Sequence, residues 1–178
     1  MLKHTFCHIP GFGAGTERTL WQAGLHGWED ILNQPDLPLS SKKQATLHSH
    51  IRESIAQLQA GNGDYFYGLL PSDQQWRLFP AFRDQVAYFD IETTGLGDPS
   101  DYITTIVLYD GRQVRSYVSG QNLEDFARDI ADYRLLVSYN GKTFDVPFVR
   151  RCLGAPLNQP HIDLRYVLGS LGYRGGLK

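Results

Sequence analysis

The pattern of hydrophobic and polar positions changes along the chain, and its two forms predict two kinds of structure. Apolar residues recur every three or four positions between Ser40 and Gly61, and this spacing predicts an amphipathic helix that Ser40 or Ser41 caps. In the second half, short runs rich in aromatic and β-branched residues take over, and they predict buried strands. We therefore expect a helical arm over residues 1–60, an aromatic connector over 61–84 and an α/β core over 85–178.

The order of the apolar runs in the second half predicts a particular sheet. Three antiparallel strands form a meander, a helix follows, and a fourth strand returns parallel to the first. A fifth strand is expected to end near Asp163. The expected strands are the run that begins at Val86, Tyr102 to Tyr109, Gln113 to Ser119, and Leu135 to Tyr139. The expected helix is capped by Asn122 and runs to Tyr133. This order is typical of a ribonuclease-H-like mixed sheet flanked by helices.

Two carboxylates lie in the strand that begins at Val86, where its burial should be complete. Side chains alternate across a strand, so Asp90 and Glu92 point to the same face, about 7 Å apart along the chain. Like charges at the end of a buried strand repel each other and lose hydration. A hard divalent cation, which prefers carboxylate oxygens, relieves both costs. The alternative is an ordinary strand end whose two acids face water.

A third carboxylate is expected beside this pair. After the fourth strand, Asn140-Gly141 predicts a turn and Thr143 predicts a helix cap. On the helix that follows, Asp145 shares a face with residues expected in the core, namely Phe148, Val149 and Cys152. If the first and fourth strands are neighbours, Asp145 joins the other two carboxylates where a parallel α/β sheet usually binds its ligand.

Composition and charge narrow the function classes only slightly. The chain has 178 residues and a net charge of −2, so no broad positive field favours nucleic acid, although a carboxylate-lined metal site adds negative charge of its own. Cys7 and Cys152 form neither a metal-ligand spacing nor a disulfide framework, and we expect both to be reduced and to fill space. We find no signal peptide and no membrane-spanning run, and we expect a cytoplasmic protein without a membrane partner.

The glycine-rich segment near the N-terminus leaves two interpretations open. It resembles a helix-hairpin-helix unit, in which the turn at Gly11–Gly15 offers backbone N–H groups to a nucleic acid phosphate and Thr16 caps the helix. The alternative, favoured by the scarcity of lysine and arginine here, is a helical hairpin that only packs on the main domain. The aromatic residues of 61–84 could stack bases, but we favour a packing role for them.

Two motifs resemble a known enzyme family. Asp-Ile-Glu-Thr-Thr-Gly-Leu at 90–96 and Ser-Tyr-Asn-Gly-Lys-Thr-Phe-Asp at 138–145 resemble the first two motifs of the DEDD superfamily of 3′→5′ exonucleases. Residues 6–11, 20–21 and 76–79 extend the similarity to the YprB-like branch, which has a ribonuclease-H-like domain. The resemblance implies two-metal hydrolysis of phosphodiesters, with the 3′ ends of single-stranded DNA or RNA as partners.

The resemblance also implies roles for individual residues. Two Mg²⁺ or Mn²⁺ ions about 4 Å apart would lie in the complete site. Asp90 would be the shared ligand, Glu92 would hold the ion that generates the nucleophile, and Asp145 would bind on the other side. The residues implied to line the pocket of the terminal nucleotide are Thr93, Thr94, Gly95, Leu96, Asn140 and Phe144.

The sequence departs from the family pattern after Asp145. The last motif, a Tyr-x-x-x-Asp or His-x-x-x-x-Asp, is not found there, and Tyr133 and His161 fail as substitutes on spacing. We expect Asp163 to be a helix cap rather than the fourth carboxylate. We therefore expect a C-terminally truncated exonuclease core whose activity in this form is open. The alternatives are a non-catalytic nucleic-acid-binding module and a scaffold that docks a partner or a second copy on an uncovered sheet face.

Overall fold

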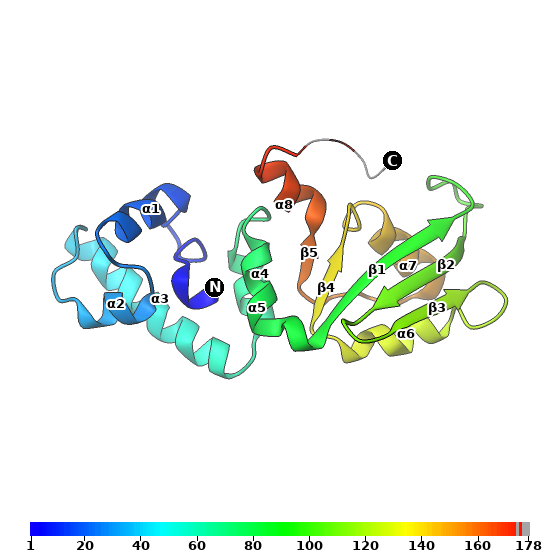
Figure 1. Cartoon of the computed structure of the whole chain (residues 1–178), viewed down its shortest axis with the longest axis horizontal. Coiled ribbons are helices and arrows are strands. Elements are labelled where there is room, and N and C mark those ends of the chain that lie inside the picture. The colour runs from blue at the N-terminus through cyan, green and yellow to red at the C-terminus, as the bar shows by residue number, and fades with distance from the viewer. Residues whose placement is uncertain (174, 176–178) are drawn as a thin grey trace. The chain divides into compact units, whose positions relative to one another are not determined.

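The computed structural model describes residues 1–173 and 175, and the chain divides into two compact units, Met1–Ala81 and Phe82–Lys178 (Figure 1). Residues 61–84, expected to form a connector, supply helices to the first unit up to Ala81. Within the described residues, no helix combines the length and the hydropathy that a transmembrane span requires.

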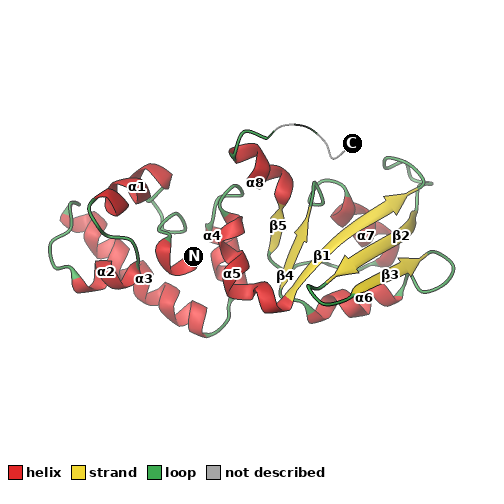
Figure 2. Cartoon of the chain, in the orientation of Figure 1, coloured by secondary structure: helices red, strands yellow, loops and turns green. Residues whose placement is uncertain are grey.

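The first unit is helical (Figure 2). Its helices are the 3₁₀ helix Leu2–His4, α1 (Ala14–Gln22), α2 (Trp28–Asn33), α3 (Ser41–Gln59), α4 (Gly63–Leu69), the 3₁₀ helix Gln75–Leu78 and α5 (Phe79–Phe82), which reaches the unit boundary. The predicted helix is confirmed as α3, and Ser40 occupies its N-cap position, although the Ser40 side chain makes no capping hydrogen bond. The prediction that Thr16 caps α1 is wrong. Gly13 is the N-cap, and its carbonyl already accepts the amide of Glu17 at 3.0 Å.

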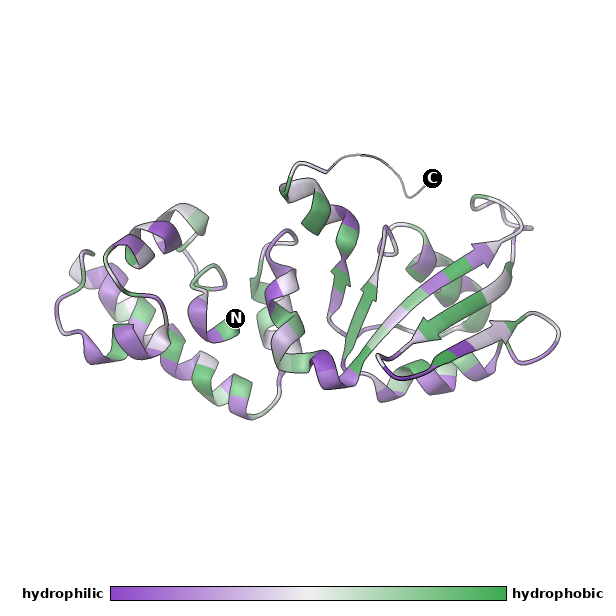
Figure 3. Cartoon of the chain, viewed as in Figure 1, coloured by the Kyte–Doolittle hydropathy of each residue, from purple (hydrophilic) through white to green (hydrophobic). Residues whose placement is uncertain are grey.

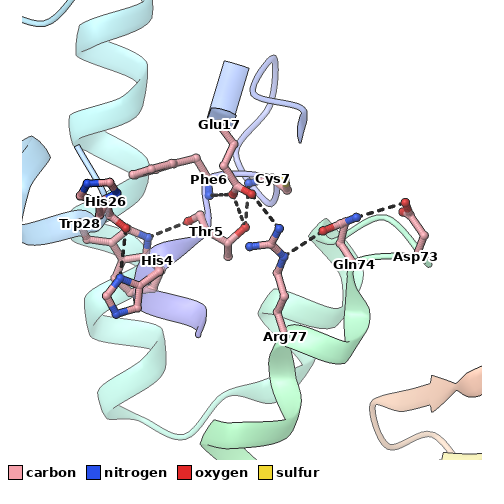
Figure 4. Close-up of polar contacts among 10 residues, drawn as sticks. All are labelled: His4, Thr5, Phe6, Cys7, Glu17, His26, Trp28, Asp73, Gln74 and Arg77. Carbon is pink, nitrogen blue, oxygen red and sulfur yellow. Dashed lines mark hydrogen bonds and ion pairs between the residues drawn. The ribbon is translucent and has the colours of Figure 1, made fainter. Parts of the chain in front are cut away.

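A buried carboxylate holds the first unit together (Figure 4). Glu17 is only 1% exposed, and one of its oxygens accepts hydrogen bonds from the Thr5 hydroxyl and the Phe6 amide, both at 2.7 Å. Its other oxygen lies 2.7 Å from the Arg77 guanidinium. Burying a charge is costly unless it is paired and hydrogen-bonded, and here every oxygen has a partner. The pair therefore ties residues near the N-terminus to the segment at Arg77.

The second unit contains one five-stranded sheet with the order β3-β2-β1-β4-β5. Its strands are β1 (Val86–Thr93), β2 (Ile103–Tyr109), β3 (Val114–Val118), β4 (Leu135–Ser138) and β5 (His161–Asp163). The pairs β1–β2 and β2–β3 are antiparallel, whereas β1–β4 and β4–β5 are parallel. The predicted meander and parallel return strand, and with them the mixed ribonuclease-H-like sheet, are confirmed.

One face of the sheet carries the core. Hydrophobic residues are concentrated along the strands (Figure 3), and those at 87, 89 and 91 of β1 pack with α6 (Asp125–Asp129) and α7 (Asp145–Leu153). The remaining helices of this unit are the 3₁₀ helix Arg83–Gln85, the 3₁₀ helix Ile130–Asp132 and α8 (Leu164–Ser170). Because side chains alternate, Tyr88, Asp90 and Glu92 lie on the opposite face.

For two helices of this unit, the residue predicted to cap the N-terminus is wrong. Asn122 does not cap α6, whose N-cap is Glu124. The Asn122 side chain instead accepts the Val118 amide at 2.8 Å, at the end of β3. Thr143 does not cap α7, because its hydroxyl donates to Asn140 of the preceding turn. In both cases the side chain is satisfied by a nearer turn, which competes with the capping geometry.

The residues predicted to form the inner, buried face of α7 are confirmed in the first two turns of the helix, but the prediction is wrong for the last turn. Asp145, Phe148 and Val149 are buried, but Cys152 is exposed. In the last turn Leu153 packs against the core instead. Cys7 is buried as expected.

We expect Glu17→Ala to destabilise the first unit by about 3–5 kcal/mol, because it leaves the buried Arg77 guanidinium without its counter-charge. Urea unfolding combined with amide exchange over residues 1–81 measures the change. The matched control is Asp125→Ala, which breaks the exposed Arg128–Asp125 pair and should cost about 0.5 kcal/mol or less. Equal losses in the two variants would contradict the role given to Glu17.

Candidate functional site

A pocket of about 510 Å³ lies beside the C-terminal half of β1. It is lined by Asp90, Ile91, Glu92, Thr93, Thr94, Gly95, Leu96, Tyr139, Asn140, Phe144 and Asp145. All nine residues singled out from the sequence therefore border one cavity. Sequence reasoning missed Ile91 and Tyr139. Tyr139 could have been found from its position, because it directly follows β4 and precedes the turn that enters the pocket.

The pairing of the strands explains why the pocket lies here. β1 pairs with β4 only from Val86 to Tyr88, although β1 itself continues to Thr93. On its other side β1 remains paired with β2, and Asp90 and Glu92 face Val107 and Thr105 across that pair. The segment that follows β4 therefore lies beside the C-terminal half of β1, next to the exposed carboxylates of Asp90 and Glu92.

Asp145 reaches the pocket from the first position of α7 and is almost completely buried, at 3% exposure. Burial, and then the charge of Asp90, raise the pKa of this carboxyl to about 7. Its Oδ1 atom has no hydrogen-bond partner among the residues that the structure describes. A buried carboxylate oxygen without a donor is costly to keep, so this atom is suited to an external ligand of positive charge.

The donor set fits a hard divalent cation. Carboxylate oxygens are the ligands that Mg²⁺ and Mn²⁺ prefer, and the charge of Asp90 acts on the Asp145 carboxyl, whose Oδ1 has no partner among the described residues. In the described part of the chain, however, no three His, Cys, Asp or Glu side chains are grouped closely enough for a ready-made metal site. Asp90, Glu92 and Asp145 thus share the pocket without forming a ligand cluster, as mutual repulsion of carboxylates favours.

A loop after β1 forms another wall of the pocket. The Asp101 carboxylate accepts the amides of Gly97 at 2.9 Å and Asp98 at 2.8 Å, and it lies so close to Gly95 that a Cβ atom there would collide with it. Arg151 of α7 donates to the carbonyl oxygens of residues 97 and 101. Leu96 is left 91% exposed at the pocket. Glycine at position 95 is therefore required by close packing.

The turn predicted as a phosphate-binding hairpin lies in the first unit, in a smaller pocket of about 260 Å³. This pocket is lined by residues 7–13 and Leu69. His8 in this wall packs against the rings of Trp28 and Phe66, and burial lowers the pKa of its imidazole to about 4. His8 is therefore neutral at pH 7 and adds no positive charge for a phosphate.

Comparison with known proteins places the second unit in a family. Residues 87–178 match RNase_H_2, described as RNase_H superfamily. The family B DNA polymerase from the hyperthermophilic archaeon Pyrobaculum calidifontis is similar with a TM-score of 0.31 and 27% identity, over 40% of this chain and 11% of that chain. The Aedes aegypti Nibbler EXO domain is similar with a TM-score of 0.39 and 13% identity, over 60% of each chain.

This chain thus spans less than two thirds of either solved chain. No curated protein matches it in sequence. The family match covers slightly more than half of the 178 residues. The chain belongs to the RNase_H superfamily.

Proposed function

We propose that the second unit is a metal-dependent 3′→5′ exonuclease of the DEDD type, of the YprB-like branch, which hydrolyses phosphodiesters of single-stranded DNA or RNA. The observation that carries the proposal is the pocket itself. It brings Asp90, Glu92 and Asp145 together with the 93–96 segment, and it contains a buried carboxylate oxygen that lacks a partner among the described residues. Membership of the RNase_H superfamily supports a nuclease that acts on nucleic acid.

The proposed cofactor is Mg²⁺ or Mn²⁺, with two ions in the complete site. Such ions lower the pKa of bound water and stabilise charge on the leaving oxygen. Asp90 is the proposed shared ligand, because its charge already acts on Asp145. Glu92 is the proposed ligand on the side of the attacking water. Asp145 contributes the Oδ1 atom that no described residue satisfies.

The rest of the pocket is proposed to hold the terminal nucleotide. The Asn140 Oδ1 atom accepts hydrogen bonds from Arg165 Nη1 at 2.6 Å and from Thr143 Oγ1 at 2.7 Å. Since its oxygen is occupied, Asn140 can offer its amide N–H groups to a phosphate or sugar oxygen. Leu96, exposed and apolar, provides a surface for a base, and the 93–95 backbone and Phe144 complete the binding wall.

A second candidate, self-association, rests on the outer face of the sheet. Val107, Tyr109 and Val114 are exposed at 39%, 43% and 64%, and the pairing of Tyr109 with Val114 places them on one face. An exposed apolar strip of this kind favours contact with another protein surface. The proposed occupant of this strip is a second copy of the chain. The unit would then serve as a scaffold for self-association, either in addition to nuclease activity or without it.

Digestion of 5′-labelled single-stranded DNA and RNA with Mg²⁺ or Mn²⁺ tests the proposed activity. We expect a ladder that shortens from the 3′ end, and we expect Asp90→Asn to reduce the rate by a factor on the order of 10³ because it removes a ligand charge from the reacting centre. The control is Asp125→Asn, which changes an exposed carboxylate on α6 and should leave the rate unchanged. Equal digestion by wild type and Asp90→Asn would exclude the assignment.

Stability measurements test the electrostatics of the proposed metal site independently of catalysis. Because the folded-state pKa of Asp145 is raised from 3.8 to about 7, its ionisation lowers stability as the pH rises through this range. At pH 8 with EDTA, Asp145→Asn should therefore raise the free energy of unfolding by about 2–4 kcal/mol. Added Mn²⁺ should stabilise wild type more than the variant. A variant that is no more stable, or that gains as much from Mn²⁺, would contradict this prediction.

Sedimentation velocity over a range of protein concentrations tests self-association. If the outer face mediates it, wild type should shift toward a dimer as its concentration rises, and Val114→Lys should remain monomeric because a charge interrupts the apolar strip. The control is Ala131→Lys, which adds the same charge at an exposed position of the 3₁₀ helix Ile130–Asp132, outside the strands that carry the three apolar residues. A wild-type sedimentation coefficient that is independent of concentration would rule out the second candidate.

A further inference from the structure

Asp163, the last residue of β5, lies against the turn that leaves β4. Its carboxylate is buried, with the residue 2% exposed. Oδ1 accepts the Arg165 amide at 3.0 Å, which makes Asp163 the N-cap of α8. The sequence predicted this cap. The same carboxylate also accepts the amides of Asn140 at 2.8 Å and Lys142 at 3.1 Å, from the segment between β4 and α7. One buried side chain thus joins two loops.

The turn that Asp163 holds has little freedom to adopt another shape. Asn140 has a φ of +62°, a left-handed conformation that most residues adopt only at a cost and that asparagine tolerates better than most. A Cβ atom at Gly141 would collide with the Ser138 hydroxyl, which is itself 2.7 Å from the His161 ring nitrogen. The turn is therefore pressed against the ends of β4 and β5. The bonds to Asp163 offset the cost of its backbone conformation.

The position of the turn determines the position of the pocket residues that follow it. The Asn140 carbonyl accepts the amide of Phe144 at 3.2 Å, and the Gly141 carbonyl accepts the amide of Val146 at 2.8 Å. The first residue of α7, Asp145, lies between these two bonds. A displacement of residues 140–142 is thus passed to the carboxylate at the pocket and to the side chain of Asn140.

A second tie acts on the same residue. Arg165, which follows Asp163 by two positions, donates to the Asn140 side-chain oxygen at 2.6 Å. The start of α8 therefore holds both the backbone and the side chain of Asn140, although in the described residues α8 contributes no side chain to the pocket wall.

We propose that Asp163 is a positioning residue of the pocket. Asp163 is neither a pocket-lining residue nor one of the proposed metal ligands, and it fixes the 140–142 turn so that Asn140 and Asp145 take their places in the wall. The charge of Asp163 also acts on the Asp145 carboxyl, and Asp163→Asn removes that charge while it keeps two of the three acceptor bonds. Its effect on hydrolysis rests on the proposed function, whereas its effect on the turn does not.

Two variants and one control test this proposal. Asp163→Ala removes all three acceptor bonds, while Asp163→Asn keeps an oxygen for the Asn140 and Arg165 amides and places an N–H group against that of Lys142. The control is Asp110→Ala. Asp110 accepts the backbone amides of Arg112 and Gln113, and also the Tyr133 hydroxyl, in a turn outside the set of described residues that line the pocket.

The first readout is amide exchange of residues 138–145, followed by NMR or mass spectrometry. We expect Asp163→Ala to increase exchange at Asn140 and Lys142 while the amides of β1 and β2 keep their protection. Asp163→Asn should affect Lys142 more than Asn140, and Asp110→Ala should affect neither. Unchanged exchange in Asp163→Ala, or an equal increase across the whole sheet, would overturn the proposal. This readout remains decisive even if the wild-type protein proves to have no nuclease activity, in which case only the proposed function fails.

The second readout is steady-state digestion of the labelled strand by wild type and variants at a temperature where circular dichroism shows each of them folded. We expect kcat/KM to fall by a factor on the order of 10² in Asp163→Ala, as for a misplacement of about 1 Å at a reacting centre. Asp163→Asn should be intermediate, and Asp110→Ala should stay within about twofold of wild type although it also loses backbone hydrogen bonds. Wild-type kcat and KM in Asp163→Ala, or an equal loss in Asp110→Ala, would overturn the proposal.

Discussion

The parallel pairing of β1 with β4 ends after three residue pairs, and the candidate site depends on this early end. Val86 to Tyr88 pair with Leu135 to Val137, and β1 then continues for five more residues. Because β4 ends at Ser138, the chain turns there and brings the start of α7 beside the C-terminal half of β1. A longer fourth strand would fill the space that residues 139–145 now occupy at the pocket.

Three buried carboxylates show how burial leads to different roles. Glu17 is satisfied on both oxygens by an arginine, a hydroxyl and an amide, and it stabilises the first unit. Asp163 is satisfied by three backbone amides and fixes a turn. Asp145 keeps an oxygen without a partner among the described residues and lies in the field of Asp90, so its pKa rises. The cost of desolvation is common to all three, and the number of donors separates structural carboxylates from one suited to bind a ligand.

Two of the failed cap predictions share a physical cause. Asn122 and Thr143 were expected to cap helices because of residue type and position, but their side chains bond to a strand end and a turn only three or four residues away. A cap is worth about 1 kcal/mol, which another local hydrogen bond of similar strength can offset. Thr16 failed differently, since α1 already begins at Ala14 and Thr16 lies inside it. Cys152 is exposed, and Leu153 packs against the core in the last turn of α7.

The sequence by itself determined the mixed sheet and indicated nine of the residues that line the pocket. Short apolar runs and the crossover rule predicted the sheet, the spacing of Asp90, Glu92 and Asp145 predicted that these three lie near one another, and the resemblance to a known family supplied the other six. The tertiary structure alone decided which carboxylate oxygen of the pocket lacks a donor among the described residues, and that Asp163 reaches both Asn140 and Lys142. The contacts of Asp163 join residues that are more than twenty positions apart in the sequence. They also depend on β4 ending at Ser138, where the turn begins. Hydrogen bonds act only within about 3 Å, a precision that sequence patterns do not contain.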